Sequence, residues 1–491
     1  MGIGIAIICA VALSLFAVQN KRLVAYALLF LYIFFPEMGP GFTSFGSSFV
    51  FDQTFLNFYN FKFIEIVTPA IYIAMLFSRT NQGTSYLAFE KKLAWWFVGL
   101  ILCLIAIEYF LHGNLTVGDF RLIISGVMLF HIFAMCINSE DDLISFVKVF
   151  IILLSIRALI GLVQYLIGHG VSSPRGVVPF FWDSRQIRAF GIGAIFLVAY
   201  LANFRALKPS NQIFSRVLAV VMLVVLLATV TLCMRRTVWF ITILGSLFVI
   251  AYSKRIGQFH YILIGLIAML VLTLILTLPG FKDFRARMEV QINSLNLFSA
   301  EVSQQYDNKV HIDNVKLYTQ MIMENPSILG FGFRAYPNND YLQLQYKYSG
   351  REQEMLGAAH NAILRSIYFY GSIGLLIYLV FYVRLIIQLP KVLRISDSLL
   401  SRQLALVSIS LLFLELGSAL TFSPPFYTTS KGLFYTFIAA LLVNASLYFG
   451  AQNQLSANKE IGEDVDNGKD RILRRAVRGI SSQKTTHEGR I

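Results

Sequence analysis

The sequence predicts an all-α fold, a polytopic transmembrane helical bundle of about 12–13 spans with one large, partly helical outer loop. Of its 491 residues, 56% are hydrophobic and only 14% are charged, whereas charged residues supply about a quarter of a soluble domain. The apolar residues gather in runs, many of them long enough to cross a hydrocarbon core of ~30 Å. Lys and Arg flank these runs and concentrate on alternate loops. Together, these observations exclude a cytoplasmic globular enzyme.

The apolar runs are the candidate spans. They cover residues 3–19, 22–35, 61–78, 93–112, 121–137, 145–168, 188–204, 216–233, 237–253, 260–279, 362–388, 403–422 and 432–450. The second run is short for a full crossing, so a tight hairpin of the first two runs would change the span count.

Two polar segments divide the chain into four parts. The parts are residues 1–279 with transmembrane helices 1–10, loop 280–361, residues 362–450 with helices 11–13, and a basic, mobile tail, 451–491. In the loop, apolar residues at helical spacing predict an amphipathic helix over 314–325, which Pro326 ends. In the tail, RILRRAVRGI (471–480) is either a basic amphipathic helix for the inner membrane surface or a solvated segment.

The loop charges set the expected orientation. The richer set of alternate loops carries Lys21, Arg22, Arg79, Lys91, Lys92, Lys148, Arg205, Lys208, Arg216, Lys254, Arg255, Lys391, Arg394 and Arg402. The poorer set carries Arg121, Arg175, Arg185, Arg188, Arg235, Arg236 and Lys431. The richer set belongs in the cytoplasm with the tail, which leaves the N-terminus and the 280–361 loop outside.

Other classes of site are not expected. The net charge is +14. Most of the basic residues flank the apolar runs and do not form one soluble basic face, so no nucleic-acid partner is predicted. The four cysteines lie in or beside apolar runs without a CxxC pair, which indicates neither a disulfide nor a metal site. Residues 3–18 lack a basic region and a cleavage site, so we expect no removable signal peptide.

Arginines on the outer side form the first candidate site. Arg185 and Arg188 open the seventh span, and Arg235 and Arg236 lie in the short turn between the eighth and ninth spans. These three spans hold no acidic residue, so an anionic ligand would neutralise the arginines at the hydrocarbon boundary. The guanidinium fork suits phosphate. The alternative is that these arginines are interfacial anchors.

His360 and Asn361 open the eleventh span on the same side. The helix dipole disfavours a charged imidazole there, so His360 would be a neutral ring able to accept a proton. The alternative is a helix cap. Nearby, Gly330 and Gly332 in GFGF are interpreted as turn glycines rather than a nucleotide loop, and Gly371 and Gly374 as glycines of close helix approach.

Several segments resemble the O-antigen ligase and O-antigen polymerase superfamily. The resemblance rests on NPSILGFGF (325–333) and AHNAILRSIYFYGSIGLL (359–376), with RAFGIGAIF (188–196) and CMRRTVWFI (233–241) similar to the two upstream Arg segments. The order of segments matches over about residues 185–380. Met234 and Arg235 depart from the small polar residue before the family's Arg, so which of Arg235 and Arg236 faces substrate stays open. His311 stands where the family often has Arg.

The resemblance implies a bacterial inner-membrane glycosyltransferase that needs neither cofactor nor metal. It would move a glycan from undecaprenyl pyrophosphate to an acceptor hydroxyl on the periplasmic side, inverting the anomeric centre. His360, Arg236 and Arg188 would be catalytic. Arg235, Arg185 and Asn361 would bind substrate, and loop tyrosines, among them Tyr336 and Tyr341, would stack on sugars unless they are interfacial aromatics.

Other partners and functions stay open. The acceptor would be a growing glycan (polymerase), lipid A core (ligase) or a protein, and membrane lipids and envelope polysaccharide assembly proteins are further expected partners. The second hypothesis is a secondary transporter or flippase. It is supported by charged residues in or near spans, namely Lys148, Arg157 and Glu415. The third is a membrane scaffold.

Overall fold

The structure is a computed structural model of the whole chain. It describes residues 11–16, 19–34, 63–77, 88–112, 117–167, 171–173, 176–178, 184–204, 212–233, 236–251, 306–324, 326, 328–330, 362–388, 390–391, 403–409, 438, 440–449 and 451. The longer helices are α2 (Lys21–Phe34), α3 (Phe63–Phe77), α4 (Ala88–His112), α5 (Val117–Cys136), α6 (Glu140–Leu166), α7 (Ser184–Ala202), α8 (Arg216–Leu232), α9 (Arg236–Ala251), α13 (Tyr306–Glu324) and α16 (Ala362–Ile387).

The helices follow the predicted apolar runs. Each of α2 to α9, and α16, falls on one run, and the described parts of the first and last two runs are also helical. The run at 260–279 lies outside the described residues. Two helices, Glu140–Leu166 and Ser366–Ile387, are long and apolar enough to cross a membrane, while six other apolar stretches have only 10–17 residues. Two helices thus have the length and composition of a membrane span, and the count of about 12–13 spans stays a prediction.

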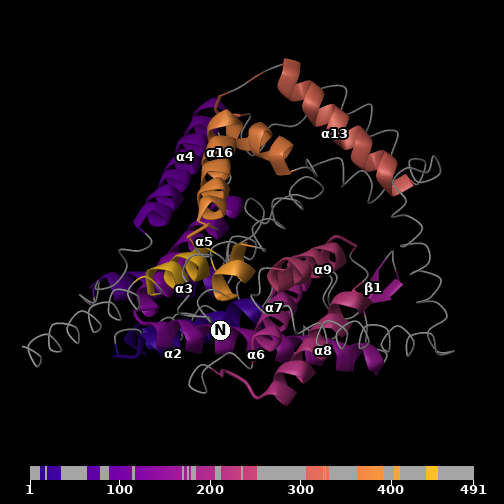
Figure 1. Cartoon of the computed structure of the whole chain (residues 1–491). Coiled ribbons are helices and arrows are strands. Elements are labelled where there is room, and N and C mark those ends of the chain that lie inside the picture. Colours follow the sequence, from indigo (N-terminus) through magenta and orange to yellow (C-terminus); the bar gives the residue numbers. More distant parts are fainter. Residues whose placement is uncertain are drawn as a thin grey trace, which may run out of the picture.

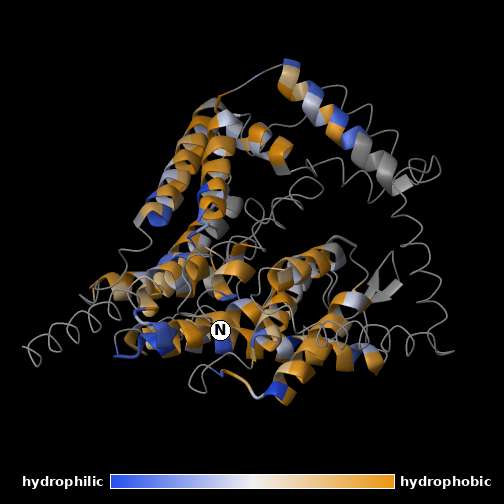
Figure 2. Cartoon of the chain, viewed as in Figure 1, coloured by the Kyte–Doolittle hydropathy of each residue, from blue (hydrophilic) through white to orange (hydrophobic). Residues whose placement is uncertain are grey.

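Hydrophobic residues make up most of the length of most helices, apart from α13 (Figure 2), and many of their side chains are exposed. Phe77, Phe110 and Val217 are 82%, 84% and 75% exposed. A soluble monomer rarely exposes large contiguous apolar patches. Apolar surface of this kind suits contact with lipid, because a helix that faces lipid tails needs no polar side toward water.

The helices pack in two groups in Figure 1. In one, α7 packs on α8 and α9, while α6 packs on α2 and α8; in the other, α16 packs on α4 and α13. Helix α5 contacts α2, α3 and α4 and so links the groups.

The start of α6 shows how local sequence fixes one of these contacts. The Ser139 hydroxyl accepts from Asp142 N at 3.1 Å, and the Asp142 carboxylate accepts from Ser139 N at 3.0 Å, which makes a capping box. Arg22 of α2 pairs with the same carboxylate. The Asp142 carboxylate that caps α6 therefore also binds α2 through Arg22.

A short hairpin lies between α6 and α7, and the other elements of the described residues are helices, as predicted. Strands β1 (Val171–Ser173) and β2 (Gly176–Val178) form an antiparallel hairpin with Ser173 opposite Gly176. Three-residue strands are too short to show the alternation by which strands are recognised in a sequence.

Candidate functional site

The arginine-bearing ends of α7 and α9 lie at the same end of α8. Helices α7 and α8 are antiparallel, since Tyr200 contacts Phe214 at the start of α8 and Gly193 lies against Leu226 further along it. Helix α9 starts where α8 ends, and the Trp239 indole donates to Val230 O at 2.8 Å. The starts of α7 and α9 are therefore neighbours.

Gly191 permits the close packing of α7 on α9. A Cβ on Gly191 would lie 2.5 Å from Thr242 Oγ1 and 3.5 Å from Val238 Cγ1. Gly191 comes one turn after Arg188, and Val238 comes two residues after Arg236, the first residue of α9. The contact thus joins the helical turns that carry the two arginines.

Two adjacent helix starts favour an anion. The first backbone N–H groups of a helix have no intrahelical partner, and the dipole adds positive potential there. Arg185, Arg188 and Arg236 lie in these first turns of α7 and α9, with side chains outside the described part of the structure, as is the whole of Arg235. The backbone brings together three of the predicted arginines.

A second contact joins α16 to α13 and residues 328–330. We call these residues the outer segment, because the loop charges predict that they lie outside. Gly371 interrupts α16 with φ 69° and ψ −168°, and Gly330 has φ 77°. Ile373 N donates to Ile328 O at 3.4 Å, and a Cβ on Gly330 would lie only 2.5 Å from Gly371 N. The backbone after α13 therefore crosses α16 at its break.

This crossing explains the glycines of the two motifs. Gly330 was predicted to be a turn glycine and has the left-handed φ that favours glycine. Gly371 was predicted to allow close helix approach; the close approach is confirmed, but its partner is the 328–330 backbone rather than a helix. Aromatic packing extends the contact, with the Tyr318 ring of α13 5.0 Å from that of Tyr368 in α16.

The remaining predicted site residues lie outside the described residues. His360 and Asn361 come directly before Ala362, the first residue of α16, and Tyr336 and Tyr341 lie in the segment after Gly330. The main contacts of α16 are with α4 and α13. The structure thus brings the outer segment to the helix that follows His360, but it does not pack that helix on the arginine pair.

Sequence reasoning missed a buried ion pair at the other end of α16. The Arg384 Nε donates to Glu90 Oε1 of α4 at 2.8 Å, and the Glu90 side chain is only 1% exposed. The Arg384 guanidinium also lies 3.9 Å from the centre of the Phe89 ring. Both charges lie near those ends of predicted spans that are expected to face the cytoplasm, and this position was the available signal. Next to this pair, burial lowers the pKa of Lys91 to about 8.

His131 also gains a specific environment. The Trp95 indole N–H points at His131 Nδ1 at 3.4 Å, and Tyr72 Oη lies 3.2 Å from the same nitrogen. Nδ1 therefore accepts and the ring proton sits on Nε2. This cluster links α3, α4 and α5, which indicates a structural role for a histidine that stands alone in the sequence.

Within the described part of the chain, no group of three or more His, Cys, Asp or Glu residues could hold a metal ion. Neither a scan against protein-family models nor a search of curated proteins found a match for this chain.

Proposed function

We propose that the chain is a multi-pass enzyme of the bacterial inner membrane that transfers a glycan on its periplasmic face. The donor is a glycan on undecaprenyl pyrophosphate and the acceptor is a sugar hydroxyl in surface polysaccharide biosynthesis. The observation that carries the proposal is the packing of α7 on α9 through Gly191 and Thr242. It sets two arginine-bearing helix starts side by side, an arrangement suited to a pyrophosphate.

The arginines act on the leaving group. Arg188 and Arg236, with Arg185 or Arg235, bind the pyrophosphate and stabilise the negative charge that grows on it as the sugar departs. The backbone N–H groups at the two helix starts add further donors for phosphate oxygens. No metal ion is required for this charge stabilisation.

His360 acts on the acceptor. The acceptor hydroxyl oxygen forms a bond to the anomeric carbon while the bond from that carbon to the pyrophosphate oxygen breaks, and the hydroxyl proton passes to His360. Asn361 orients the hydroxyl, and one displacement inverts the anomeric centre. We further propose that loop 280–361 holds the acceptor glycan. The Gly330–Gly371 crossing supports this role of the loop, because it holds the backbone before Tyr336 and Tyr341 against the helix that follows His360.

The test is glycan transfer by the purified full-length protein with an undecaprenyl-pyrophosphate-linked donor. His360→Ala should lose transfer by at least 100-fold, and Arg236→Lys should lose much of the rate because an ammonium cannot replace the planar fork. His112→Ala, at the outer end of α4, is the matched control. Undiminished transfer by His360→Ala at equal protein level would refute the assignment of the base.

The acceptor class is separated by deleting the gene and examining surface polysaccharide. Lipopolysaccharide with a single repeat unit identifies a polymerase, and accumulated long lipid-linked polymer identifies a ligase. A lost capsule or exopolysaccharide identifies a polymerase of secreted polymer.

A secondary transporter or flippase is the second candidate. A buried charged side chain within an apolar helix favours it, since Arg157 of α6 is only 7% exposed and such groups often mark transport pathways. Substrate uptake by proteoliposomes without any glycan transfer would establish the transporter. If the protein is instead a scaffold, the Arg and His substitutions should be silent in both assays.

A further inference from the structure

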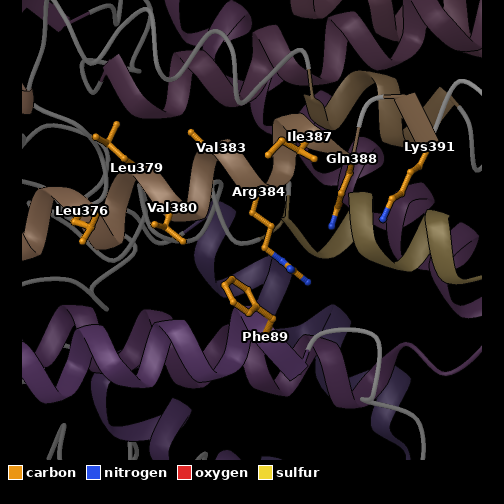
Figure 3. A pocket seen from close by; sticks show the side chains of 9 residues that line it. All are labelled: Phe89, Leu376, Leu379, Val380, Val383, Arg384, Ile387, Gln388 and Lys391. Carbon is orange, nitrogen blue, oxygen red and sulfur yellow. The ribbon is translucent and has the colours of Figure 1, made fainter.

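A groove of about 550 Å³ runs along the C-terminal half of α16 beside the start of α4. Its apolar lining is Leu376, Leu379, Val380, Val383 and Ile387. Figure 3 shows these side chains along α16, with Phe89 of α4 across from them. Leu376 and Ile387 are 61% and 64% exposed, so the groove forms an open apolar slot along α16. This helix is long enough to cross a membrane.

Cations stand at one end of this slot. Arg384 and Lys391 line it together with Gln388, and Figure 3 shows Arg384 extending over Phe89. The Arg384 side chain is 41% exposed even though its Nε binds the buried Glu90 carboxylate. Glu90 therefore fixes the guanidinium in place while much of it still faces the slot.

The neighbouring residues leave this end positive. Lys391 is exposed, and the two lysines that follow Glu90 in α4, Lys91 and Lys92, do not line the slot. Gln388 is held by Asn444, whose side-chain oxygen accepts from it at 3.1 Å, so the exposed Lys391 and the half-exposed Arg384 are the groups that meet a ligand. The loop charges predict that this end lies in the cytoplasm.

We infer that this groove binds an anionic phospholipid of the inner leaflet. An acyl chain fills the slot along Val380 and Val383, and the headgroup phosphate lies between Arg384 and Lys391. The occupant is not the chain's own basic tail, because residues 471–480 carry four arginines that these cations would repel. The inference rests on the proposed membrane placement and concerns the end of the bundle opposite the proposed transfer site.

The test compares two lipids with the same acyl chains on the full-length protein in detergent. Native mass spectrometry should show dioleoyl phosphatidylglycerol retained in preference to dioleoyl phosphatidylcholine. Lys391→Gln should lower phosphatidylglycerol retention about fivefold, the effect of one cation near a lipid headgroup, and Val383→Trp should abolish the preference by filling the slot. Lys92→Gln is the matched control and should bind as the wild type does.

Equal retention of both lipids would overturn the inference, as would an equal loss in Lys92→Gln and Lys391→Gln. The glycan-transfer assay with His360→Ala tests the proposed function separately, because its outcome does not depend on the lipid measurement. Recovery of the protein in the soluble fraction would refute the membrane placement on which both rest.

Discussion

Replacing Gly371 with alanine should detach the outer segment from α16. Gly371 has φ 69° and ψ −168°, a region that is essentially restricted to glycine and costs other residues about 1–3 kcal/mol. The added methyl would also overlap Ile328 O and Gly330 N, and overpacking of this kind costs a further ~1–3 kcal/mol. We expect a total of about 3 kcal/mol, at the lower part of the summed range, because the outer segment can move away.

Hydrogen exchange measures this loss locally. A cost of 3 kcal/mol corresponds to a factor on the order of 100 in the opening equilibrium. Peptides from 306–324 and 362–370 should therefore exchange on the order of 100-fold faster in Gly371→Ala, because opening of the crossing exposes both segments. Peptides from α7 should be unchanged, since the main contacts of α7 are with α6, α8 and α9.

Gly99→Ala is the matched control for the substitution. Gly99 lies inside α4 with nothing within 4 Å of an added Cβ, so Gly99→Ala should stabilise helix α4 by about 0.5–1 kcal/mol. Gly330→Ala should resemble Gly371→Ala, and the double variant should cost less than the sum because both methyls disrupt one contact. Wild-type exchange of 306–324 in Gly371→Ala would refute the crossing.

Three further substitutions or measurements test other contacts. Gly191→Ala should lower glycan transfer at least tenfold by pushing α7 from α9, and Thr242→Ala should restore part of it by removing the oxygen 2.5 Å from the new methyl; absence of rescue would contradict the contact. Arg384→Leu should destabilise the detergent-purified protein by about 3–5 kcal/mol, since it leaves a buried carboxylate unpaired, and Glu90→Leu in the same chain should recover most of the loss in thermal unfolding. Lys91 should react with an acylating reagent half-maximally near pH 8, against about pH 10.4 for an ordinary lysine, because only the neutral amine reacts and the lowered pKa exposes it earlier as pH rises. Mass spectrometry that shows Lys91 labelling only above pH 10 would contradict this.

The positions of the helices were predictable because the signal is local. An apolar run and its flanking charges define a helix without reference to the rest of the chain, and α2 to α9 match their runs closely. Helix α13 begins at Tyr306, eight residues before the predicted start. Its first turns are polar and show no apolar period, so the pattern could not reveal them although they are helical.

The partners of the helices were not predictable, because one sequence does not state which distant residues meet. Glu90 and Arg384 are 294 residues apart, and each alone looks like an ordinary charge at the end of a span. The glycine motifs were partly predictable from the sequence. Gly330 and Gly371 both indicate unusual backbone, but only the structure shows that they contact each other.

The contacts of α16 also explain why a histidine at its start would depend on the outer loop. The break at Gly371 separates a short outer part, which follows His360, from the longer part that Glu90 holds through Arg384. Tyr318 of α13 packs on Tyr368 in the outer part, while Phe97 of α4 meets Tyr370 beside the break at 5.5 Å between ring centres. A glycine break transmits little bending stiffness. The direction of the outer part is therefore set by α13 and by the 328–330 crossing more than by the helix beyond Gly371. A change in the loop predicted over 280–361 can thus reposition the start of α16, which follows the proposed base His360, while the ion pair stays in place.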